Sequence, residues 1–165
     1  MTANTSTVDS LVRSVSGLVA FDKANIEALA GAPLQAGDED PDLVQYSADL
    51  PQGPFSRVEL RVPAQQRDHA WRLVIAYVRP GTRLSFAELR GELIPADSAV
   101  SINPRVPPDG TVTYAVEQPG LSTRYQFGAR SSCLQLIAFH QEVRHVGKNS
   151  VSGAGFGLDV HGLRG

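Results

Sequence analysis

Alternating apolar and polar positions between residues 55 and 143 form the clearest pattern in the chain. Successive side chains of a strand point to opposite faces of a sheet, so a two-residue period is typical of half-buried strands. The pattern therefore predicts a mainly β protein. The positions that share a face in three such runs are Val58, Leu60, Val62; Val112, Tyr114, Val116; and Leu121, Thr123, Tyr125, Phe127.

Turns rich in proline and glycine divide this region into separate strand-like runs. The run from Ala70 to Arg79 is apolar on both faces, so we expect it at the centre of a sheet. The last three runs are joined by short turns and predict an antiparallel meander. Residues 95–108 are expected to be a long connection. The predicted runs cover 43–46, 56–62, 70–79, 111–117, 121–127 and 132–143.

Residues 83–94 fit either a strand or a short helix. Leu84 and Phe86 alternate as in a strand, whereas Ser85 and Glu88 have the spacing of a capping box at a helix start. Both alternatives stay open from the sequence.

Two helices are predicted before the strands. Apolar residues recur at helical spacing from about Thr7 to Ala20, with Ser6 and Asp9 spaced as a capping box. A second helix is predicted to begin after Asp22 and to end at Gly31.

Together these elements predict an antiparallel β-sandwich or partly open barrel of about six to eight strands with two N-terminal helices. We expect a single domain over residues 1–165, because chains of this length usually form one core. Its parts are a helical segment over 7–31, a β core over 43–146 and a glycine-rich C-terminal segment over 147–165.

Net charge and apolar content indicate which classes of partner to expect. The net charge is −2, which does not favour nucleic acid as a partner, because phosphate neutralisation needs clustered cations. No apolar run approaches the roughly 18 residues of a membrane span, so we expect no membrane and a cytoplasmic location. Cys133 is the only cysteine, so no disulfide can form within the chain.

An acidic loop is the first candidate site, for a metal ion. Asp38, Asp40 and Asp42 have the spacing of the first ligands in an EF-hand, but the glycine and the glutamate required later in that loop are missing. We therefore favour a solvated loop and expect neither a metal nor a cofactor.

A pocket inside the β layer is the second candidate site. Trp71, Tyr77, Tyr125 and Phe127 could line it, because ligand pockets are rich in aromatic side chains. His140 and Glu142 share a strand face and could stand at its rim as a base with its partner, so they are the candidate catalytic residues.

Arginines on the polar faces of strands form a third pattern. Arg57, Arg61 and Arg124 would make an anion-receptive ladder if their strands were neighbours, but a solvated sheet face is favoured.

The C-terminal segment is rich in glycine, and four of its apolar residues are candidate anchors. Because ordering glycine-rich backbone costs conformational entropy, we expect these residues to be buried against a surface in an oligomer. They are Phe156, Leu158, Val160 and Leu163.

No motif in the chain suggests a family. The favoured hypothesis is a non-catalytic protein-binding or assembly subunit that self-associates or binds another protein through its first helix and its C-terminal segment. The alternative is a small-ligand-binding β-barrel enzyme or carrier with the His140 and Glu142 pair at the pocket rim. A cavity of several hundred Å³ that reaches His140 would favour this alternative.

Overall fold

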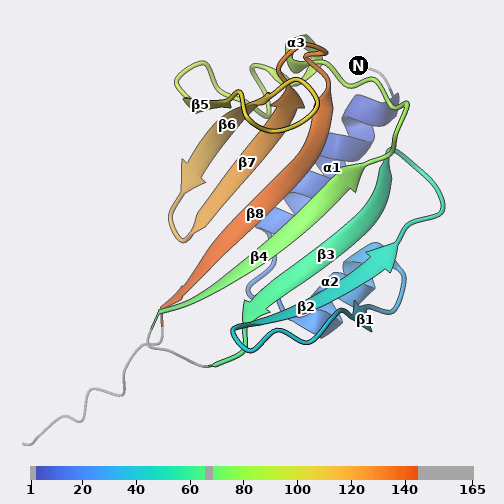
Figure 1. Ribbon diagram of the computed structural model, residues 1–165, viewed down its shortest axis with the longest axis vertical. Coiled ribbons are helices and arrows are strands. Elements are labelled where there is room, and N and C mark those ends of the chain that lie inside the picture. Colours follow the sequence, from blue (N-terminus) through green and yellow to red (C-terminus); the bar gives the residue numbers. More distant parts are fainter. Residues whose placement is uncertain (1–2, 66–68, 145–165) are drawn as a thin grey trace, which may run out of the picture.

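The computed structural model describes residues 3–65 and 69–144, which form three helices and one eight-stranded sheet within these ranges (Figure 1). The helices are α1 (Ala3–Ser16), α2 (Lys23–Ala30) and α3 (Phe86–Leu89). The strands are β1 (Gln35–Ala36), β2 (Leu43–Asp49), β3 (Phe55–Pro63), β4 (His69–Val78), β5 (Ala99–Asn103), β6 (Thr111–Gln118), β7 (Leu121–Gly128) and β8 (Leu134–Arg144).

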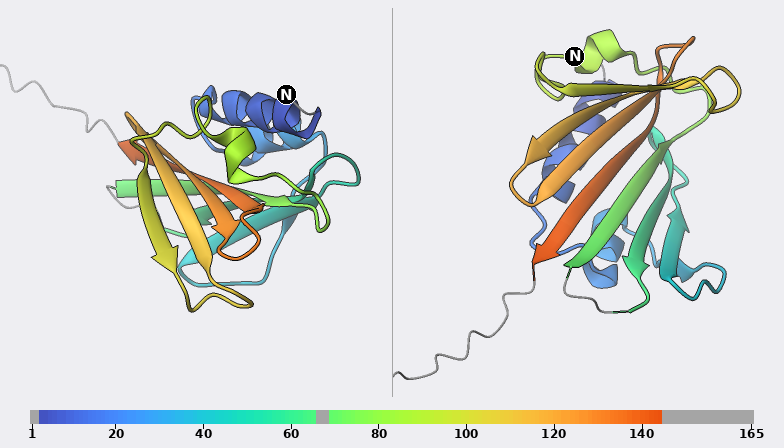
Figure 2. Two further views of the ribbon diagram at one scale, coloured as in Figure 1. Left: turned by 90° about the horizontal axis from the view of Figure 1, so that it is seen from above. Right: turned by 60° about the vertical axis from the view of Figure 1, so that its left-hand side comes forward.

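The sheet is antiparallel throughout, with the order β1-β2-β3-β4-β8-β7-β6-β5. Strands β1 to β4 and strands β5 to β8 form two halves, and pairing of β4 with β8 joins them at the centre. The mainly β prediction, the final meander and the central place of β4 are confirmed. The sheet twists strongly (Figure 2), and its two ends do not pair with each other in the described residues, so it is not a closed barrel.

The connection predicted over 95–108 contains a strand, so that prediction is wrong in part. Strand β5 pairs with β6 and forms one edge of the sheet, and all five of its residues are exposed. An edge strand packs on few neighbours and therefore needs little hydrophobic pattern, which is why its sequence resembles a loop.

Both N-terminal helices are present, with α1 displaced from its predicted range. It begins before the expected capping box, so Ser6 lies inside the helix, and the Gly17 N–H donates to the Arg13 carbonyl at its end. In α2, the Asp22 carboxylate accepts from the Asn25 N–H at 2.8 Å, and Gly31 closes the helix with φ +66°. Within the described residues, no helix is long and apolar enough to cross a membrane.

Residues 83–94 contain the short helix rather than a strand. The Glu88 carboxylate accepts from both the backbone N–H and the hydroxyl of Ser85, each at 2.8 Å. These two bonds, the backbone one first, hold the pKa of Glu88 below its ordinary value. The capping box that the sequence suggested is therefore formed at α3.

The core lies between one face of the sheet and the helices α1 and α2. Val8 and Val15 of α1 and Ile26 of α2 are completely buried, and Leu11 and Leu18 pack partly buried against the same cluster. Each side chain of this size gains roughly 1.5–3 kcal/mol on full burial, so the apolar stripe of α1 is used within the subunit. The buried residues that the strands contribute to this core include Val58, Leu60, Val74, Ala76, Tyr125, Phe127, Ile137 and Phe139.

Candidate functional site

The face of the sheet opposite α1 and α2, here called the open face, has no helix on it in the described part of the chain. In Figure 1 the helices lie behind the sheet, so the viewer looks at the open face. Because strand side chains alternate between faces, the residues between the core positions point to it. They are Arg57, Glu59 and Arg61 of β3, Trp71, Leu73, Ile75 and Tyr77 of β4, Leu136, Ala138, His140 and Glu142 of β8, Ser122, Arg124 and Gln126 of β7, and Thr113, Ala115 and Glu117 of β6.

The open face is hollowed between β4 and β5 into a trough of about 670 Å³. Five neighbouring strands, from β4 across β8, β7 and β6 to β5, contribute to its lining. Leu73, Leu136 and Ala138 make an apolar floor in the middle of the sheet. The full lining is Leu73, Ala99, Val100, Ser101, Thr113, Ala115, Glu117, Arg124, Gln126, Leu136, Ala138 and His140.

Three ionisable side chains stand in the trough. Arg124 has no ion pair or side-chain hydrogen bond to any residue in the described ranges. The Glu117 carboxylate accepts from the Ser122 hydroxyl at 2.8 Å. Arg124 is therefore the cation whose charge stays available for a bound molecule.

His140 connects the trough with the neighbouring aromatic residue on β4. Its ring stacks with that of Trp71, with centroids 6.1 Å apart and ring planes at 23°. Trp71 itself is half-buried and lies just beyond the trough lining. The stack places two aromatic rings side by side at this point of the rim.

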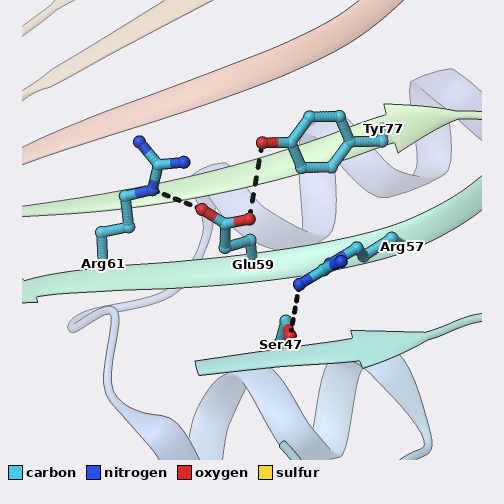
Figure 3. Close-up of polar contacts among 5 residues, drawn as sticks. All are labelled: Ser47, Arg57, Glu59, Arg61 and Tyr77. Carbon is cyan, nitrogen blue, oxygen red and sulfur yellow. Dashed lines mark hydrogen bonds and ion pairs between the residues drawn. The ribbon is translucent and has the colours of Figure 1, made fainter. Parts of the chain in front are cut away.

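A separate polar cluster occupies the open face on the β2–β3 side (Figure 3). Glu59 is only 3% exposed, and its carboxylate accepts from the Arg61 guanidinium and, at 3.4 Å, from the Tyr77 hydroxyl. Burial first, and then the negative charge of Glu59, raises the pKa of Tyr77. Arg57 donates to the Ser47 hydroxyl at 2.8 Å. The residues of this cluster satisfy one another, so it stabilises the sheet rather than presenting free groups to a ligand.

The ladder of three arginines is not formed. Arg57 and Arg61 lie on β3, but β4 and β8 separate them from Arg124 on β7. The two β3 residues are also engaged by Ser47 and Glu59. Only Arg124 remains as an anion-receptive group from that pattern.

The four aromatic residues predicted to line one pocket lie on opposite faces, so this prediction is wrong. Trp71 and Tyr77 point to the open face, whereas Tyr125 and Phe127 are buried in the core on the opposite face. The register explains the difference: the Trp71 face of β4 continues through His140 on β8 to Ser122 and Arg124 on β7. None of the four lines the trough.

Only one of the two candidate catalytic residues lies in the trough. His140 lines it, whereas the exposed Glu142 lies one step further along β8, opposite Trp71 in the register. The backbone N–H of Glu142 donates to the Gly120 carbonyl at 3.1 Å. No side-chain contact joins the two residues among those that the structure describes, so a base with an orienting carboxylate is not formed here.

The acidic loop lies at the far edge of the sheet, beside a shallow hollow of about 520 Å³ lined by residues of 36–45. One Asp40 carboxylate oxygen accepts from the Asp42 backbone N–H at 2.8 Å, which is a local turn bond. Over residues 3–65 and 69–144 no group of three acidic, histidine or cysteine side chains is placed to hold a metal.

The predicted partner-binding residues Phe156, Leu158, Val160 and Leu163 lie outside the described residues.

Three residues of the trough lining, Ala99, Val100 and Ser101, were not predicted from the sequence, because their strand was interpreted as a connection. The alternation of Val100 and Ile102 was the signal that could have found it.

Comparison with known proteins gives no relative from which a function could be transferred. No protein-family model, curated protein or solved structure matches the chain.

Proposed function

We propose that the protein binds a small amphipathic molecule in the trough, with an apolar body and an anionic group. The observation that carries the proposal is Arg124, which lacks an ion-pair partner in the described residues and stands beside an apolar floor. Ligand sites typically enclose roughly 300–1,000 Å³ and combine an apolar lining with a few polar groups. The volume of about 670 Å³ and the lining of the trough agree with both features.

Each part of the ligand has a matching part of the trough. The apolar body would cover Leu73, Leu136 and Ala138, which gains about 25 cal/mol per Å² of apolar surface removed from water. A carboxylate, sulfonate or phosphate would pair with the planar guanidinium of Arg124, which can donate two parallel hydrogen bonds. Glu117 would accept from a donor group and repel a second anion, so a singly anionic ligand fits best.

This proposal favours the alternative drawn from the sequence over the assembly hypothesis. The apolar stripe of α1 is buried in its own subunit and is not free for a partner. The hollow also reaches His140, as a ligand site in the β layer requires. We infer a binding or carrier role, because His140 and Glu142 do not form a catalytic pair. The cytoplasmic location stays a prediction.

Fluorescence titration tests the proposal with two probes. Anilinonaphthalene sulfonate has an aromatic body and a sulfonate, and phenylnaphthylamine is a neutral analogue without it. We expect saturable binding of both probes with a change in Trp71 emission. Arg124→Ala should weaken the sulfonate about tenfold, in keeping with the loss of one charged hydrogen bond, and should leave the neutral probe within about twofold.

Arg83→Ala is the matched control, because Arg83 is an exposed arginine outside the trough with no side-chain partner in the described residues. Circular dichroism must show every variant folded, since loosened proteins also bind such dyes. Equal binding of the sulfonate to wild type and to Arg124→Ala would refute the role of Arg124. Absence of saturable binding by both probes would refute the trough as a ligand site.

A further inference from the structure

In the described part of the chain, the outer edge of β5 is an unprotected sheet edge. Val100 is 55% exposed and Ile102 is 70% exposed, and β5 contains neither a charged residue nor a proline. Soluble proteins usually blunt such edges with charges, prolines or very short strands. The opposite edge of this sheet follows that rule, because β1 has only two residues. The exposed β5 edge therefore needs an explanation.

The turn between β6 and β7 determines which backbone N–H and C=O groups of β6 point to β7 and which point to β5. Pro119 and Gly120 form a two-residue turn, so the flanking residues Gln118 and Leu121 are a hydrogen-bonded pair. In an antiparallel ladder such pairs alternate with pairs that lack these bonds. The even-numbered residues of β6 therefore bond to β7, and the odd-numbered residues bond to β5.

The same alternation determines which groups of β5 are free. Ser101 is opposite Thr113, and Ala99 and Asn103 are also opposite odd-numbered residues, so these three bond to β6. The backbone N–H and C=O groups of Val100 and Ile102 therefore point outward, away from the sheet. Within residues 3–65 and 69–144, these two residues thus present four unpaired backbone groups, two donors and two acceptors, to an incoming strand.

We propose that two copies of this chain pair through β5, antiparallel and related by a two-fold axis at Ser101. In this register Val100 of each copy lies opposite Ile102 of the other. All outward backbone groups then find partners, because each Val100–Ile102 pair exchanges two hydrogen bonds. The four exposed β-branched side chains meet on one face of the joined sheet, which removes them from water.

The neighbouring registers are less favourable for a chemical reason. Shifting the pairing by two residues one way places Val100 opposite Pro104, which has no N–H to donate. Shifting it the other way places Ile102 opposite Ser98, whose N–H already donates to the Pro95 carbonyl at 3.1 Å. The Ser101 register is therefore the one that uses every outward group.

Charge complementarity supports a second copy as the partner. Asp97 and Arg105 flank β5 at equal distances along the chain from Ser101, so the two-fold axis brings Asp97 of one copy toward Arg105 of the other. Both residues are exposed, and neither forms an ion pair within residues 3–65 and 69–144. The segment is thus complementary to itself in hydrogen bonds, apolar side chains and charge.

Sedimentation of the full chain from about 1 µM to about 1 mM tests this proposal. A five-residue strand pair is small compared with interfaces of about 1,000 Å² or more, so we expect a reversible dimer. Asp97→Arg and Arg105→Asp should each weaken dimerisation about tenfold, because each puts like charges together at both ends of the pair. The double variant Asp97→Arg with Arg105→Asp should restore it to within about threefold.

Asp38→Arg is the matched control, because Asp38 is an exposed aspartate at the far edge of the sheet, and it should leave the dimer unchanged. Circular dichroism would confirm that all variants fold. A wild-type protein that stays monomeric throughout overturns the proposal. A dimer insensitive to both single swaps, or not restored by the double swap, places the contact elsewhere and also overturns it.

Discussion

The indole ring of Trp71 stacks with the imidazole ring of His140, with centroids 6.1 Å apart, across the central β4–β8 pair. The register places Leu73 opposite His140, so the stacked residues are diagonal neighbours. Because His140 lines the trough and Trp71 is the only tryptophan, the emission of Trp71 reports on the trough rim.

This stack should contribute measurably to stability. In a double-mutant cycle of Trp71→Ala and His140→Ala, we expect a coupling of about 0.5–1 kcal/mol in the free energy of unfolding, as for other ring pairs. Urea denaturation followed by circular dichroism gives the four values. Strictly additive single effects would contradict the prediction.

The buried carboxylate of Glu59 should matter more than an exposed one. Glu59→Gln keeps the size of the side chain but leaves Arg61, whose side chain is 33% exposed, without its anion. We expect a loss of about 1–3 kcal/mol in the free energy of unfolding. Glu39→Gln, in the exposed loop, should change it by about 0.5 kcal/mol or less. Equal effects of the two variants would show that the Glu59 pair does not stabilise the sheet.

The same substitution can be compared at two valines near the N-terminus, one buried and one exposed. Val15 is fully buried against the sheet, whereas Val19 is 96% exposed. Val15→Asp should lower the free energy of unfolding by several kcal/mol, because an unpaired charge enters the core. Val19→Asp should change it by about 0.5 kcal/mol or less. If Val15→Asp melts like the wild type, α1 does not pack on the sheet.

Stability should fall at alkaline pH because of Tyr125. Burial raises the pKa of Tyr125, with a smaller contribution from the charge of Asp9. Above the unfolded pKa of about 10 the unfolded state releases this proton and the folded state keeps it. Each further pH unit then lowers the free energy of unfolding by about 1.4 kcal/mol until the folded pKa is reached.

Denaturation curves of wild type and Tyr125→Phe between about pH 8 and pH 11 would measure this effect. The variant should lose less stability than the wild type as the pH rises above about 10, because it has no phenol to ionise at that position. Parallel pH dependences of the two proteins would show that Tyr125 titrates normally.

Local features were predictable from the sequence because neighbouring residues determine them. Asp22 and Gly31 delimit α2 through bonds to backbone groups a few residues away, and the meander of β6, β7 and β8 is joined by short turns. The central place of β4 was also predictable, since a strand that is apolar on both faces must be covered on both sides.

The same property of β4 prevented a correct prediction of the site. Because both faces of β4 are apolar, its sequence does not reveal which face meets the helices. Trp71 and Tyr125 therefore looked like neighbours, and only the pairing across β8 places them on opposite faces. A shift of one residue in that register would exchange the two faces.

The amino-acid sequence by itself thus determines the spacing of apolar positions, the helix caps and the turns. All of these depend on interactions over a few residues. The tertiary structure alone decides that β8 pairs with β4, that β5 forms an edge, and that Arg124 faces an apolar floor. These relations join residues far apart in sequence, and they depend on which registers bury the most apolar surface while pairing the backbone groups.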